Sequence, residues 1–236
     1  MIRPESLNRC MKKWVLSVAP QLAEKIETEE EEQDKKKKKK LTVAIDGKEI
    51  RSTGKMKKYD SPLHIVSAQI GELGLTLAQR TVASKSNEIP AVQELIKELE
   101  IAGCMVVADA LNCQIQTAQA IIDSKADYLL SAKGNQKELM SDIAEYVQDE
   151  NLRAKMDSTT RTERGHGRKE TRSAYTTDDV LWQIGGRKWP ALKCIGAVHT
   201  RFERSKGVTD EWHYYISSKV LSAVELLLIM HELNGR

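Results

Sequence analysis

Several features that would assign a function at once are scarce or missing in this sequence. Its four cysteines are scattered through 236 residues without paired spacing, so neither a zinc knuckle nor a disulfide framework is indicated. The apolar runs are too short to span a bilayer and the first residues show no signal-peptide pattern, so we expect no membrane partner and a reducing cytoplasm. No glycine-rich loop matches a Walker or dinucleotide fingerprint, which argues against a doubly wound nucleotide-binding sheet.

The composition does provide enough apolar sequence for a sizeable core. Hydrophobic residues make up 40% and charged residues 30% of the chain, as in a soluble globular protein of one or two domains. The net charge of +3 is weak evidence for a polyanionic partner. The distribution of charge therefore matters more than its sum.

Two apolar runs each deliver an aspartate at the same relative point. Residues 41–45 lead into Asp46, and Gly47 is predicted to end that strand; residues 104–108 lead into Asp109. A carboxylate at the end of a buried strand needs a hydrogen-bonding or metal partner. Either the two carboxylates meet over one site, or each aspartate caps the turn that follows it.

The order of predicted elements indicates a fold. Strands at 41–46, 64–70 and 74–82 form an antiparallel meander, and helices at 88–100, 117–124 and 136–148 alternate with strands at 104–108 and 127–131. This is the order of a ribonuclease-H-like α/β fold, a mixed sheet with flanking helices. In that architecture the first and fourth strands are neighbours, which would bring Asp46 and Asp109 together.

Adjacent carboxylates predict a metal ion. Two ionised carboxylates a few ångströms apart repel unless a cation sits between them, and oxygen-only ligands favour Mg²⁺. Two such ions can stabilise the attacking and leaving oxygens of phosphodiester chemistry, a scheme that needs a third acid.

Several ordered motifs carry a resemblance to a known family. They are Val43-Ala44-Ile45-Asp46-Gly47-Lys48, Lys85-Ser86-Asn87-Glu88-Ile89, the runs 109–114 and 127–136, Gly165-His166-Gly167-Arg168 with Glu170 and Arg172, and Tyr214-Tyr215-Ile216-Ser217-Ser218. From Pro4 to its C-terminus the sequence resembles bacterial insertion-sequence transposases, specifically the H-repeat-associated, Rhs-linked group of DDE transposases.

The resemblance implies DNA transposition, with phosphodiester cleavage and strand transfer at insertion-sequence ends. The implied cofactor is Mg²⁺, with Mn²⁺ as a substitute, and Asp46 and Asp109 are the implied metal ligands and first two catalytic acids. We expect double-stranded DNA partners, both transposon ends and target, a homodimer, and a location in the bacterial cytoplasm.

The domain boundaries combine the composition of the N-terminal stretches with the same resemblance. We expect a helical remnant of an N-terminal region at 1–27, a charged low-complexity linker at 28–40, and the ribonuclease-H-like core at 41–236 with an inserted β-rich region at 150–216, before the last helix. Family members have a longer N-terminal region, so the chain is predicted to be truncated at both ends.

The third acid does not follow the family pattern. In the family it lies on a helix after the strand at 214–218, beyond a His-Trp pair, and this sequence has no such pair before it ends. Glu225 or Glu232 would substitute for it, although each lies about two helical turns too early. We therefore expect impaired catalysis; the alternative function is that of a catalytically inactive DNA-binding remnant.

Basic residues form the expected DNA contacts. They are Lys48, Lys133, Arg164, His166, Arg168 and Arg172. Two of them keep a second interpretation. Lys133 begins a Lys-Gly-Asn-Gln stretch that also fits a simple strand-to-helix turn. His166 lies between glycines, where the pattern favours a phosphate contact or a plain loop over a metal ligand. Cys113 has no neighbouring base in sequence, which opposes a nucleophilic role.

Overall fold

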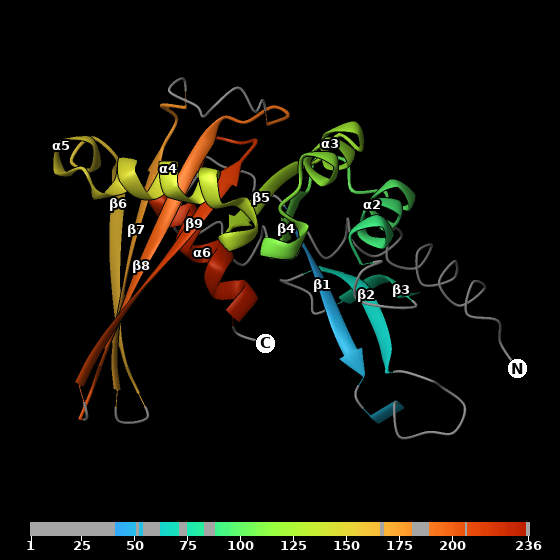
Figure 1. Ribbon diagram of the computed structural model, residues 1–236, viewed down its shortest axis with the longest axis horizontal. Helices are drawn as coiled ribbons and strands as arrows, with labels where there is room; N and C mark the ends of the chain where they lie inside the picture. The colour runs from blue at the N-terminus through green and yellow to red at the C-terminus, as the bar shows by residue number, and fades with distance from the viewer. Residues whose placement is uncertain are drawn as a thin grey trace, which may run out of the picture. The chain divides into compact units, whose positions relative to one another are not determined.

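The computed structural model describes residues 41–50, 52–53, 62–70, 75–82, 88–165, 168–180, 189–205 and 207–234 (Figure 1). The predicted N-terminal helix and charged linker lie outside these residues. The elements are β1 (Thr42–Ile50), β2 (Leu63–Ile70), β3 (Leu75–Val82), α2 (Glu88–Glu98), β4 (Met105–Ala108), the 3₁₀ turn η3 (Ala110–Asn112), α3 (Ile115–Asp123), β5 (Asp127–Ala132), the 3₁₀ turn η4 (Gly134–Gln136), α4 (Lys137–Gln148), α5 (Glu150–Arg153), β6 (Asp157–Gly165), β7 (Arg168–Thr177), β8 (Cys194–Arg204), β9 (Gly207–Ser217) and α6 (Ala223–Asn234).

The chain divides into two compact units, Met1–Val107 with Asp123–Ala126, and Ala108–Ile122 with Asp127–Arg236. In the first unit the strand order is β3-β2-β1-β4. The predicted antiparallel meander of β1, β2 and β3 is confirmed. β4 lies beside β1, where the Met105 backbone N–H donates to the Leu41 carbonyl over 2.9 Å. Helix α2 packs on β2 and β3 and buries the predicted apolar face, because Val92, Leu95 and Ile96 recur at helical spacing.

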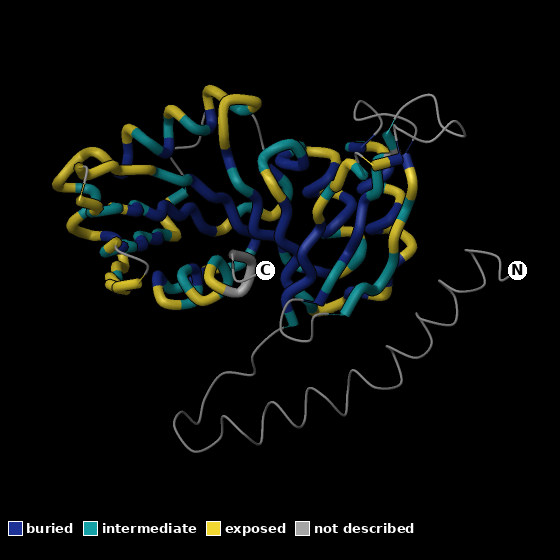
Figure 2. Tube along the Cα trace, turned by 90° about the horizontal axis from the view of Figure 1, so that it is seen from below, coloured by how far each residue is buried: buried dark blue, intermediate teal, exposed yellow. Residues whose placement is uncertain are grey.

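In the second unit the strand order is β5-β9-β8-β7-β6, and all of these pairings are antiparallel. Strands β6 to β9 are long and run side by side (Figure 1). Helix α4 packs on β5, β8 and β9, and α6 packs on β6, β7 and β8. Strand β5 and the first half of β8 are mostly buried, whereas β6 is exposed along almost its whole length; Figure 2 draws buried residues in dark blue and exposed residues in yellow.

The mixed α/β class, the flanking helices and the β-rich region before the last helix are confirmed. The order from β1 to α4 is the one predicted for a ribonuclease-H-like fold. Strand β8 pairs with β9 along its whole length and with β7 from Ile195 to Arg204. Among the described helices, none is long and apolar enough to cross a membrane.

Candidate functional site

The first candidate acid, Asp46, lies within β1 and is accessible. Its side chain is 55% exposed, and its Oδ2 lies 3.8 Å from the Nζ of Lys48, which is 73% exposed and projects from the same side of the strand. A surface ion pair of this kind contributes at most about 1 kcal/mol, so it does not sequester the carboxylate. Lys48, a predicted DNA contact, therefore lies beside a predicted catalytic acid.

The prediction that Gly47 ends the first strand is wrong. Gly47 pairs with Val66 of β2, and the ladder continues to the pair of Ile50 with Leu63. The strand continues because each of these residues keeps a cross-strand partner, and a single glycine does not remove its own backbone donor or acceptor.

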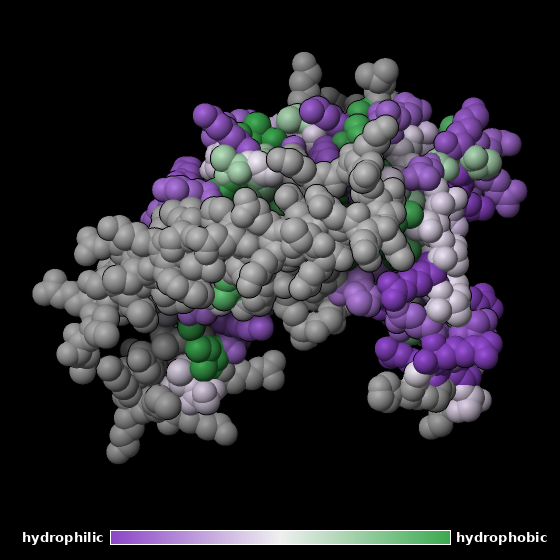
Figure 3. Space-filling view, turned by 180° about the vertical axis from the view of Figure 1, so that it is seen from behind, coloured by the Kyte–Doolittle hydropathy of each residue, from purple (hydrophilic) through white to green (hydrophobic). Residues whose placement is uncertain are grey.

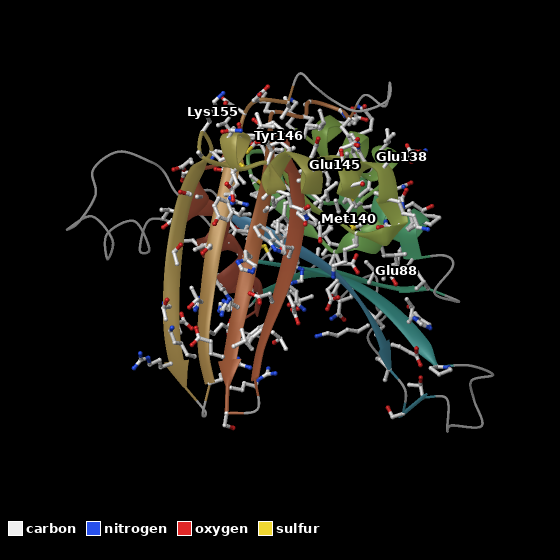
Figure 4. The ribbon with its side chains drawn as sticks, turned by 60° about the vertical axis from the view of Figure 1, so that its left-hand side comes forward. Glu88, Glu138, Met140, Glu145, Tyr146 and Lys155 are labelled. Atoms are coloured by element: carbon white, nitrogen blue, oxygen red, sulfur yellow. The ribbon has the colours of Figure 1, made fainter. Side chains whose placement is uncertain are left out.

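Gly47 instead allows a close approach by a helix. A Cβ atom at this position would lie 2.4 Å from Oε1 of Glu88, the first residue of α2. Glu88 is only 6% exposed, so its carboxylate is confined against the strand (Figure 4). Because successive side chains alternate between the two faces of a sheet, this contact is on the face opposite Asp46.

The second candidate acid, Asp109, follows the four buried residues of β4 and caps η3. Its Oδ1 accepts from the backbone N–H of Asn112 at 3.2 Å and from the Asn112 amide Nδ2 at 3.0 Å. The capping role considered from the sequence is therefore present. Both bonds use the same carboxylate oxygen, so Oδ2 takes part in neither, and the cap is compatible with a second ligand on the exposed carboxylate.

The thiol of Cys113 is unsuited to nucleophilic chemistry. It is fully buried, and burial together with the nearby charge of Asp109 raises its pKa to about 12. The thiol stays protonated at neutral pH, whereas the thiolate is the reactive form.

The turn after β5 is hydrogen-bonded to the segment that follows the second candidate acid. The Asn135 amide Nδ2 donates to the Ala110 carbonyl, and the Gln136 amide Nε2 donates to the Cys113 carbonyl over 2.9 Å. Lys133 is exposed at the start of this turn. The Lys-Gly-Asn-Gln stretch therefore forms a turn that anchors η3. Sequence reasoning concentrated on Lys133 and missed the two amides, whose signal was a polar pair in the turn that follows a buried strand.

Glu225, one proposed third acid, caps helix α6. Its Oε2 accepts from the backbone N–H of Ser222 at 2.8 Å and the Ser222 hydroxyl at 2.9 Å, and its own N–H donates to that hydroxyl, which makes a capping box. Burial raises the pKa of Glu225, but the Ser222 hydrogen bonds and the Lys219 ammonium outweigh burial and leave the pKa below its ordinary value. The side chain of Glu232 lies outside the described residues.

The basic residues predicted in the β6–β7 hairpin project from different sides of the sheet. Arg164 pairs with Lys169, so these two project together, whereas Arg168 and Arg172 project from the opposite side. His166 lies outside the described residues. Arg168 and Arg172 therefore share one surface of the hairpin, and Arg164 lies on the other.

Comparisons with known proteins identify similar sequences. A family model described as "Transposase DDE domain" matches residues 37–231. "Putative transposase YncI" of Escherichia coli O157:H7 is 37% identical over 191 residues, covering 78% of this chain and 48% of the relative. "H repeat-associated putative transposase YhhI" of Escherichia coli strain K12 is 32% identical over 188 residues, covering 77% and 50%. An "Uncharacterized protein in dhlA 3'region" of Xanthobacter autotrophicus is 32% identical over 176 residues, covering 75% and 59%.

The chain spans about half the length of the curated relatives it matches. Among solved structures, a piggyBac transposase synaptic complex with hairpin DNA matches with a TM-score of 0.40 and 11% identity, over 77% of this chain and 34% of that chain.

Proposed function

The chain belongs to the transposase DDE-domain family, and from this premise we propose that it acts in DNA transposition by metal-dependent phosphodiester cleavage and strand transfer at insertion-sequence ends. The observation that supports this most directly is the placement of the acid-bearing strands. β1 carries Asp46, β4 lies beside β1, and Asp109 is the residue that follows β4. In this proposal Asp46 and Asp109 are the catalytic acids and the metal ligands.

The two donor groups fit a hard divalent cation. Both are exposed carboxylates, and Mg²⁺ prefers oxygen ligands while keeping several waters; Mn²⁺ is the substitute. The bound ion would polarise a phosphate oxygen and lower the pKa of a bound water. The chain itself orients the ligands, since Asn112 holds Oδ1 of Asp109. Asn135 and Gln136 hold the backbone of the segment that follows it.

The proposed partner is double-stranded DNA, both transposon ends and target, bound by a homodimer. Lys48 is exposed two residues after Asp46, and Lys133 is exposed at the start of the turn that is hydrogen-bonded to the segment after Asp109. Both would contact phosphates there. Arg164 would contact the backbone from one side of the β6–β7 hairpin, and Arg168 and Arg172 from the other. His166, which lies outside the described residues, stays in the proposed set of DNA contacts.

A second candidate function is DNA binding without catalysis, and the role of Glu225 favours it. Glu225 is occupied as the cap of α6. Within the described part of the chain, no group of three or more His, Cys, Asp or Glu side chains is placed to hold a metal ion. If the third acid is missing from this chain, Asp46 and Asp109 would bind metal weakly and the protein would bind DNA without cutting it.

Nicking of supercoiled plasmid in Mg²⁺ tests the catalytic proposal. The Asp46→Asn variant should lose metal-dependent nicking, because it removes a ligand charge without changing the shape of the side chain. The matched control is Glu49→Gln, which removes one exposed carboxylate from the same strand and should nick as the wild type does. Equal nicking by Asp46→Asn and wild type would refute the role of Asp46. Salt-dependent DNA binding by a wild-type protein that never nicks would favour the second candidate.

A further inference from the structure

Strand β7 contains a buried carboxylate between two arginines. Glu170 is 6% exposed, although it lies two residues from both Arg168 and Arg172 on the same side of the strand. The Arg168 Nη2 atom lies 3.1 Å from Glu170 Oε2, and the Arg172 guanidinium pairs with Oε1. One carboxylate thus engages two guanidinium groups, one through each of its oxygens.

The burial of Glu170 makes it dependent on both arginines. Among the described residues, its buried Oε1 has no hydrogen-bond partner of good geometry, so the Arg172 guanidinium compensates its charge. A buried carboxylate is tolerated only where such partners are in place. The side chains of Arg168 and Arg172 remain 46% and 26% exposed. Each guanidinium has five N–H donors, more than its pairing with Glu170 uses.

A third arginine joins this cluster across the strands. Phe202 is opposite Glu170 in the register of β7 and β8, and Arg168 is opposite Arg204. The Cζ atoms of Arg168 and Arg204 lie 5.5 and 5.3 Å from the centroid of the Phe202 ring, within the range of cation–π attraction. Like charges directly opposite each other weaken a sheet, so the pairing of Arg168 with Arg204 favours an anionic ligand between them. Hydrophilic side chains gather over the ends of these strands in the surface view (Figure 3).

We propose that Glu170 is a positioning residue which, together with Phe202, holds Arg168, Arg172 and Arg204 as a preformed site for DNA backbone phosphates. This inference rests on the DNA-binding function proposed above and adds the groups that orient the contacts. Arginines bind phosphate through parallel N–H donors, so their orientation matters as well as their charge. Holding these long side chains in advance removes part of the ordering cost of binding.

The proposal is tested by measuring the affinity for a labelled DNA duplex over a series of salt concentrations. The decisive result is whether the Glu170→Gln variant binds more tightly or more weakly than the wild type. Glu170→Gln removes one negative charge. If Glu170 contributed only its charge, the variant protein would therefore bind DNA more tightly than the wild type. A positioning residue predicts the opposite, weaker binding by about 5- to 10-fold and a salt slope smaller by about 1. The matched control is Glu163→Gln. Glu163 is the exposed cross-strand partner of Glu170, and its neutralisation should leave binding unchanged or tighter.

The possible outcomes separate this inference from the proposed function. If the wild type shows no salt-dependent DNA binding, the proposed function fails. If the wild type binds and Glu170→Gln binds equally or more tightly, only the role of Glu170 is overturned. If Glu170→Gln does not fold by circular dichroism, Phe202→Leu decides, because it removes the cation–π support without changing charge: weaker binding supports the proposal and unchanged binding overturns it.

Discussion

Gly47 offers a direct test of how β1 is packed, through its replacement by alanine. The added Cβ would lie 2.4 Å from Glu88 Oε1, 2.5 Å from Cδ and 2.7 Å from Oε2. Non-bonded heavy atoms prefer about 3.5–4.0 Å, so the Glu88 carboxylate would have to move by about 1 Å. The end of a glutamate side chain is flexible, but this one is buried and has little room to move.

Two opposing terms set the magnitude of the effect. Overpacking of a buried contact costs roughly 1–3 kcal/mol. Replacing a glycine in a strand by alanine raises the free energy of unfolding by roughly 0.5–1 kcal/mol, because the unfolded chain has fewer conformations. We therefore expect Gly47→Ala to lower the free energy of unfolding by about 1–2 kcal/mol.

Urea unfolding of the variant and of a double-mutant cycle measures this effect. Gly134→Ala is the control, because no heavy atom lies within 4 Å of its Cβ position and the change should stay within about 0.5 kcal/mol. In a Glu88→Ala background the cost of Gly47→Ala should disappear, since the overlapping atoms are gone. A Gly47→Ala variant as stable as the Gly134→Ala control, or a cost that persists without Glu88, would refute the steric reasoning.

Two further changes test the capping roles. Asp109→Asn keeps an oxygen acceptor for Asn112, so the free energy of unfolding should change by less than about 0.5 kcal/mol. Asp109→Ala removes the acceptor and should lower the free energy of unfolding by about 1 kcal/mol. Both variants should lose Mg²⁺-dependent nicking. Equal stability losses in urea would contradict this assignment. Glu225→Gln should cost about 0.5–2 kcal/mol at pH 7. The pKa of Glu225 in the folded protein lies below the ordinary value of 4.5, so the stabilisation by its carboxylate is present above pH 4.5 and is lost as the pH falls through the folded pKa. If urea unfolding shows a stability difference between wild type and Glu225→Gln that does not change with pH, this assignment is wrong.

The sequence was sufficient where the signal is local. The alternation of apolar runs with helical periodicity predicted the order from β1 to α4, because each pattern depends on residues a few positions apart. The placement of Asp109 directly after a buried strand was also readable, and its cap on η3 matches one of the two interpretations given to it. The capping box of Ser222 and Glu225 also has a local sequence signature, but the resemblance to the transposase family led to the prediction that Glu225 is a substitute catalytic acid.

The tertiary structure decided what depends on residues far apart in the chain. Gly47 was predicted to end the strand because glycine is a common strand breaker. Its close neighbour Glu88 belongs to another element, so only the packing of α2 reveals why this position needs a residue without a side chain. The amide of Gln136 reaches the Cys113 carbonyl 23 residues away, a bond that no spacing rule predicts.

The surface assignments follow from strand register in the same way. The sequence shows that the β6–β7 hairpin is rich in arginine, but it does not show which arginines share a face. Shifting the strand pairing by one residue would move every side chain of a strand to the other face. The register alone therefore places Arg164 apart from Arg168 and Arg172 and puts Glu170 opposite Phe202. The sequence by itself determined which chemical groups the protein has and the strands that carry them, while cross-strand pairing and burial determined which of those groups share a surface.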